Sequence, residues 1–132
     1  MSEHRDKLMS YVDAYNRGDW DGLAAFVSPG YVHHSGEQVL DLAGFVRGSL
    51  WFRAGFPDFA VEVVDVVSEG GRGAMRFVAR GTHQASLFGE TPTLRTVVLD
   101  GITMYRFENG LIAEDWEMMD EGQLRRQVAP ET

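Results

Sequence analysis

The sequence predicts a single α+β domain in which three N-terminal helices pack on an antiparallel sheet formed by the second half of the chain. Two observations lead to this prediction. Apolar residues recur at helical spacing as far as residue 55, and from Phe59 onward they alternate with a period of two. At 132 residues, the chain fits one domain over 1–132, because two separate cores would be difficult to build at this length.

The three helices precede residue 56. Apolar side chains recur every three or four positions over 3–17, which predicts the first helix. Asp19 is a suitable N-cap for a second, short helix over 20–27, because its side chain can accept hydrogen bonds from the first free N–H groups. Asp41 caps a third helix in the same way, and that helix closes at Gly55.

The strands follow from the alternating pattern. Residues 31–34 predict a short strand between the second and third helices. Four long antiparallel strands joined by hairpins are predicted at about 59–68, 75–80, 97–107 and 111–119. The segment Glu108-Asn109-Gly110 predicts the last hairpin turn, and a short polar tail is expected after Met119.

Both faces of several predicted strands carry apolar residues. Val64 and Val66 lie opposite Val61 and Val63, and Ile102 and Met104 lie opposite Leu99 and Tyr105. An antiparallel sheet normally buries one face and exposes the other. We therefore expect the outer face to be covered by a second copy of the chain, giving a homodimer.

Composition excludes several classes of function. The net charge is −8, and Lys7 is the only lysine, so the chain lacks the clustered basic residues that bind nucleic acid or anionic membranes. There is no cysteine, which excludes disulfides and thiol nucleophiles. No apolar run approaches the ~18 residues needed to cross a membrane, and the N-terminus lacks the apolar core of a signal peptide. We expect a cytoplasmic protein.

Asp115 is the first candidate for chemistry, because it is a carboxylate within an apolar strand. If the preceding hairpin has a three-residue loop, Thr103 lies opposite Asp115, which then shares a face with Tyr105 and Phe107. A two-residue turn would instead pair Met104 with Asp115 and reverse the face. In the first register Asp115 lines the inner wall of a cavity, where burial destabilises the charged form and favours a role in proton transfer.

The histidines are the next candidates. His83 falls on the apolar side of its strand, and histidine is the side chain best suited to carry protons near neutral pH. His33 and His34 are neighbours on a strand, so they point to opposite faces and cannot line the same cavity. No spacing typical of a metal site, phosphate loop or dinucleotide fingerprint is present, so neither a metal nor an organic cofactor is expected.

Several motifs, taken in order along the chain, resemble those of the SnoaL-like polyketide cyclases, which belong to the superfamily of nuclear transport factor 2. They are Tyr15-Asn16-Arg17-Gly18-Asp19-Trp20, Tyr31-Val32-His33-His34, Phe56-Pro57-Asp58, Gly81-Thr82-His83, Gly89-Glu90-Thr91-Pro92-Thr93, Arg106-Phe107-Glu108-Asn109-Gly110-Leu111-Ile112 and Glu114-Asp115-Trp116 with Asp120. The resemblance implies a cone-shaped α+β barrel that encloses a pocket, and usually a homodimer packed through the sheet.

The resemblance also implies a chemistry. Such cyclases close a ring of an aromatic polyketide by intramolecular aldol chemistry without metal or organic cofactor, and an aspartate on the last strand acts as the acid and base. Asp115 matches that aspartate. The family pattern also places a histidine on the preceding strand, where this sequence has Gly101 or Thr103 instead.

The sequence therefore leads to a cofactor-independent enzyme of secondary metabolism that acts on a small hydrophobic or aromatic substrate. Asp115 is expected to be the general acid and base, with His34 or His83 polarising substrate oxygens. The residues expected to hold flat rings are Tyr15, Trp51, Phe56, Phe88 and Tyr105. An epoxide or lactone hydrolase, an isomerase, and a ligand-binding dimer without turnover remain alternatives at this point.

Overall fold

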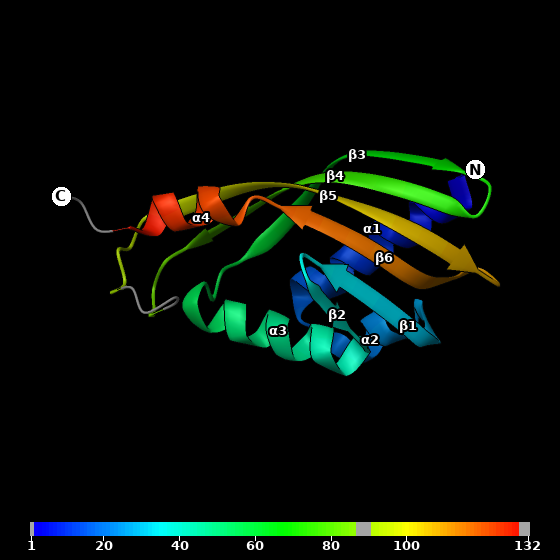
Figure 1. Ribbon diagram of the computed structural model, residues 1–132, viewed down its shortest axis with the longest axis horizontal. Helices are drawn as coiled ribbons and strands as arrows, with labels where there is room; N and C mark the ends of the chain where they lie inside the picture. The colour runs from blue at the N-terminus through cyan, green and yellow to red at the C-terminus, as the bar shows by residue number, and fades with distance from the viewer. Residues whose placement is uncertain (1, 87–90, 130–132) are drawn as a thin grey trace.

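The computed structural model describes residues 2–86 and 91–129. Within them, the helices are α1 (Ser2–Arg17), α2 (Trp20–Ala24), α3 (Leu42–Gly55) and α4 (Glu121–Val128). The strands are β1 (Val27–Ser35), β2 (Gln38–Leu40), β3 (Ala60–Glu69), β4 (Arg72–Thr82), β5 (Thr96–Glu108) and β6 (Leu111–Met119). The strands form one curved sheet in the order β2-β1-β6-β5-β4-β3, with α1, α2 and α3 on one side (Figure 1). The α+β prediction is confirmed.

The helix starts follow the predicted capping residues. The carboxylate of Asp19 accepts a hydrogen bond from the N–H of Gly22, and Asp41 accepts one from the N–H of Gly44. The core between the helices and the sheet is apolar and aromatic. Its fully buried side chains include Leu8, Leu23, Phe56, Leu99 and Ile112.

The predicted second helix is too long. In the structure α2 ends at Ala24, and Val27 begins β1 and pairs with Ile112 of β6. The two strands run parallel, whereas the four long strands pair antiparallel as predicted. Pairing along the edge of β6 competes with the weak preference of a five-residue helix to extend, and the tertiary contact decides the outcome.

The segment after Met119 is a helix and not a polar tail. Asp120 caps α4 by accepting a hydrogen bond from the N–H of Gln123, and Leu124 and Val128 are buried. The two apolar residues are spaced by four, which is the signal in the sequence that could have revealed this helix.

The last hairpin begins in the two-residue-turn register and then departs from both registers that the sequence left open. Glu108 pairs with Leu111 across a two-residue turn, but a register shift follows between Arg106 and Phe107, so that Tyr105 lies opposite Asp115. The extra residue in β6 forms a β-bulge, which shifts the pairing of the rest of β6 with β5 by one residue. Neither predicted pairing of Asp115 is correct, yet the bulge places Asp115 on the inner face as expected.

A second bulge lies between Val63 and Asp65 on β3. It changes which residues of this strand point to the outer face of the sheet. Val66 points inward and packs against the core, whereas Val64 and Val67 are exposed on the outer face. Ile102 and Met104 are exposed as expected, at 52% and 49% of their surfaces. The sheet therefore has an apolar outer face, but Val67 belongs to it and Val66 does not. The dimer stays a prediction.

Candidate active site

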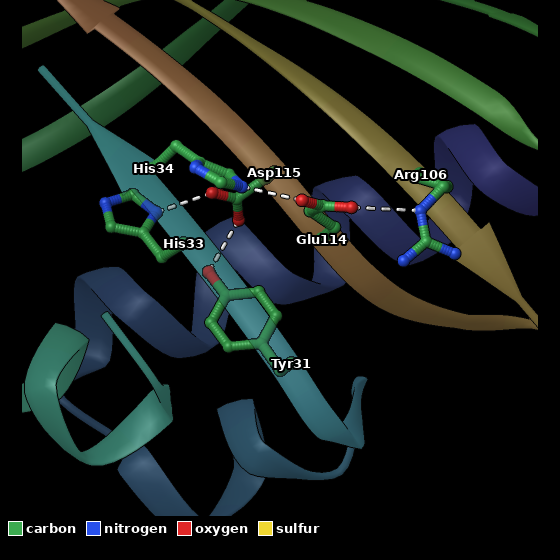
Figure 2. Close-up of polar contacts among 6 residues, drawn as sticks. All are labelled: Tyr31, His33, His34, Arg106, Glu114 and Asp115. Atoms are coloured by element: carbon green, nitrogen blue, oxygen red, sulfur yellow. Dashed lines mark hydrogen bonds and ion pairs between the residues drawn. The ribbon is translucent and has the colours of Figure 1, made fainter. Parts of the chain in front are cut away.

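The parallel pairing of β1 and β6 brings His33 directly opposite Asp115. The Nδ1 atom of His33 lies 2.5 Å from Oδ1 of Asp115, and the Tyr31 hydroxyl donates a hydrogen bond of 2.5 Å to Oδ2 (Figure 2). Tyr31 and His33 are two residues apart on β1, so both point to the same face of the sheet. The two oxygens of a buried carboxylate are therefore each held by a separate donor, and Asp115 itself is 2% exposed.

The tyrosines around Asp115 are held in the neutral form. Burial raises the pKa of the Tyr31 hydroxyl, and the nearby Tyr11 and Asp115 groups raise it further. Burial also raises the pKa values of Tyr11 and Tyr105. Tyr31 therefore acts as a hydrogen-bond donor. The buried Tyr11 hydroxyl, by contrast, makes no hydrogen bond with any residue in the described ranges.

His33 is placed to carry a positive charge. Burial opposes its protonation, but the hydrogen bond and the charge of Asp115, together with the charge of Glu117, outweigh this effect and raise the pKa of the imidazole. The ring also packs edge-on against Phe45, with the ring centres 4.8 Å apart. This packing limits the orientations that the imidazole can adopt.

Glu117 is a second carboxyl group at the same site. It follows Asp115 by two residues on β6, and its Oε1 atom lies 3.9 Å from Nε2 of His33. Burial raises the pKa of Glu117, the charge of His33 opposes the rise, and the charge of Asp115 adds to it. About a quarter (26%) of the Glu117 side chain is exposed.

Tyr11, His33, Asp115 and Glu117 line a cavity of about 1460 Å³ between the inner face of the sheet and the helices, and Tyr31 lies behind its wall. Common ligand sites measure about 300–1,000 Å³, so a molecule with several rings can be accommodated. The wall includes aromatic and apolar side chains from α1, α3, β4 and β5, and the β1–β2 turn at Gly36 forms part of the rim. The chemistry available is proton transfer within a largely apolar enclosure.

The cavity collects four of the residues predicted for the site. Tyr15, Trp51, Tyr105 and Asp115 all line it. Phe56 does not: it is fully buried and stacks on Phe52 with ring centres 5.0 Å apart. Phe88 lies outside the described residues.

The two predicted histidines lie elsewhere. His83 is fully buried, stacks on Phe56, and accepts a hydrogen bond at Nδ1 from the N–H of Thr93; it does not line the cavity. His34 is on the outer face, where Nε2 lies 2.6 Å from Oε2 of Glu114 (Figure 2). Its ring stacks on Trp116. The prediction that the adjacent histidines face opposite ways is confirmed, and His33 is the one that reaches Asp115.

Sequence reasoning missed Tyr11, Tyr31, His33 and Glu117 as members of the site. Part of the signal was present, because alternation places Glu117 on the same face as Asp115. The partnership of His33 and Asp115 was not accessible in this way, since it depends on a parallel pairing of strands about 80 residues apart along the chain.

At Gly101 on β5, the structure explains why a larger residue is absent. A Cβ atom there would lie 2.2 Å from Cζ of Phe77, so a histidine at this position would displace the Phe77 ring. Thr103, the other position considered, is buried and pairs with Glu117. Neither of these two positions on β5 therefore provides an imidazole to the site.

In the part of the chain that the structure describes, no group of three His, Cys, Asp or Glu side chains is arranged to hold a metal ion. No helix there is long and apolar enough to cross a membrane.

Comparisons with known proteins agree with this architecture. A family model described as SnoaL-like polyketide cyclase matches residues 6–128. The chain is 28% identical over 122 residues to the aklanonic acid methyl ester cyclase AcmA of Streptomyces galilaeus, covering 88% of this chain and 85% of that protein. AclR, a candidate hydroxylase from Streptomyces galilaeus, is similar with a TM-score of 0.89 and 28% identity, over 100% of this chain and 89% of AclR. IdmH, a candidate polyketide cyclase from Streptomyces antibioticus, is similar with a TM-score of 0.86 and 29% identity, over 96% of this chain and 98% of IdmH.

Proposed function

Because the chain belongs to the SnoaL-like polyketide cyclase family, we propose that it closes a ring of a polyketide in antibiotic biosynthesis, with Asp115 as the general acid and base. The observation that supports this proposal most strongly is the buried Asp115 carboxylate, which lies in the cavity wall and is held by Tyr31 and His33. A carboxylate fixed in this way can accept a proton without first reorganising its surroundings.

The reaction is an intramolecular aldol addition. Asp115 removes a proton from a carbon next to a carbonyl group, and the resulting enolate carbon attacks a second carbonyl of the same molecule. The attacked oxygen then takes up a proton, so that substrate and product have the same composition. The positive charge that His33 carries when protonated stabilises the carboxylate before the transfer.

The cavity also suits a flat, largely apolar substrate. Tyr15, Tyr105 and Trp51 line it, and Trp51 remains 54% exposed, where it can cover a ring at the entrance. Tyr11 also lines this wall, but its hydroxyl is itself buried beside Asp115 and Tyr31. Holding the folded substrate so that its reacting carbons are close lowers the entropic part of the barrier.

An enzyme is favoured over a ligand-binding module because the cavity contains a buried, oriented carboxylate. Burying a charge with two dedicated donors costs stability, and a binding site for an apolar ligand does not require it.

The test uses aklanonic acid methyl ester, the compound that gives the relative AcmA its name. We expect the purified chain to convert it, or a polyketide methyl ester of related size, into a cyclised isomer of unchanged mass. Glu114→Gln provides a control on the same strand, since Glu114 lies on the outer face with His34. A product that gains an oxygen atom would instead indicate a hydroxylase, and no conversion of such esters would contradict the proposal.

A further inference from the structure

Two carboxyl groups, Asp115 and Glu117, share the inner face of β6 but have contrasting surroundings. Asp115 accepts one hydrogen bond on each oxygen, from Tyr31 and His33. Glu117 accepts none from the residues that the structure describes, and its nearest cation is His33 at 3.9 Å. Donors that point at a carboxyl group favour its ionised form, and burial without donors favours the neutral acid.

The groups around Glu117 strengthen this contrast. They are His33 on β1, Asp115 on β6, Tyr11 and Tyr15 on α1, and Tyr105 on β5. Burial is the largest influence and raises the pKa of Glu117, and His33 only partly offsets it. A carboxyl group whose pKa is raised by burial, next to a carboxylate held by two hydrogen-bond donors, is suited to the role of the acid.

Glu117 is also accessible to a bound molecule. It lines the cavity and keeps 26% of its side chain exposed, whereas Asp115 is 2% exposed. Successive residues on one face of a strand are about 7 Å apart, a distance that a substrate with two reacting carbons can span. Glu117 pairs with Thr103 across the sheet, and the Thr103 side chain is too small to block this approach.

We propose that Glu117 is a second catalytic group, which donates a proton to the carbonyl oxygen as the ring closes. The inference rests on the proposed aldol function and adds the proton donor to it. Asp115 takes the proton from carbon, the new carbon–carbon bond forms, and the attacked carbonyl oxygen receives the proton of Glu117 to become a hydroxyl group. Asp115 is then protonated and Glu117 ionised, and both exchange protons with solvent after the product leaves.

The first test measures the protonation of Glu117 and needs no substrate. Infrared difference spectra of the wild type and Glu117→Gln at pH 7 should show a protonated carboxyl band that only the wild type has. Glu114→Gln, on the outer face of the same strand, should retain that band. If Glu117 is ionised at pH 7, the band is absent and the inference is wrong.

The second test separates the two proton transfers, with aklanonic acid methyl ester in deuterated water. We expect Glu117→Gln to keep the exchange of the acidic carbon-bound hydrogen within a few-fold, and to lose ring closure by about 10²–10⁴-fold, the range for a single acid–base group. Asp115→Asn should lose both, and Glu117→Asp should restore part of the closure.

The outcomes distinguish the inference from the function on which it rests. If the wild type neither exchanges nor closes any polyketide methyl ester, the proposed function fails. If the wild type does both and Glu117→Gln closes the ring at the normal rate, only the role of Glu117 is contradicted.

Discussion

Nδ1 of His33 lies 2.5 Å from Oδ1 of Asp115, although the two residues are 82 positions apart in the sequence. The contact exists because β1 joins the sheet parallel to β6 and places the two residues directly opposite each other. It makes His33, and not its neighbour His34 or the distant His83, the partner of the proposed catalytic carboxylate.

The adjacent histidines provide a matched pair of variants. Removing a hydrogen bond to a charged group costs about 1.5–3 kcal/mol, and each ~1.4 kcal/mol corresponds to a tenfold change in rate. His33→Gln should therefore lower turnover at least about tenfold, whereas His34→Gln, on the outer face, should leave turnover within about twofold. Steady-state rates for both variants decide the point, and equal losses would show that the inner position has no special role.

The same contact predicts how stability depends on pH. The pKa of His33 is raised in the folded protein above the ordinary value of 6.5. Its stabilising effect is thus complete below about pH 6.5 and is lost as the pH rises through the folded-state value. The difference in unfolding free energy between the wild type and His33→Gln, from urea titrations between pH 5 and 9, should shrink as the pH rises. A difference that grows with pH would contradict this assignment.

Tyr31 and Tyr11 differ in one respect that can be measured. The Tyr31 hydroxyl donates to Asp115, and the Tyr11 hydroxyl makes no hydrogen bond among the described residues. Tyr31→Phe should lower the unfolding free energy by about 1.5–3 kcal/mol, because a charged acceptor loses its donor. Tyr11→Phe should leave the unfolding free energy nearly unchanged, because it removes no hydrogen bond to a charged group. Equal destabilisation of both variants would contradict the distinction.

We propose that the exposed outer face of the sheet joins two copies of the chain. Ile102 and Met104 are about half exposed at its centre, and an apolar patch on a sheet is a common interface. Light scattering should give twice the 14.8 kDa of one chain, and Ile102→Arg should weaken the association. Glu108→Gln, at the exposed end of β5, serves as a control. A wild type that stays monomeric at micromolar concentrations would exclude this dimer.

The alternation of apolar residues predicted the long strands, and helical spacing with the capping residues Asp19 and Asp41 predicted the helices. The inner position of Asp115 was also predicted, but through a hairpin register that the structure does not have. The alternation could not locate the bulge before Asp115, because one inserted residue leaves no mark in composition. It also could not predict the parallel β1–β6 pair, which depends on packing between distant segments. For this reason His33 was missed, while His83, whose apolar surroundings suggested the cavity, is instead buried against Phe56.

The central claim is that Asp115 transfers the proton, and Asp115→Asn tests it most directly. The asparagine has nearly the same shape and its oxygen can still accept the hydrogen bond from Tyr31, so ligand affinity should change little, although the charged contact with His33 is lost. Turnover should fall by about 10²–10⁴-fold, because the amide cannot exchange a proton. A variant with normal turnover and a lower melting temperature would show that Asp115 is structural, and would contradict the account.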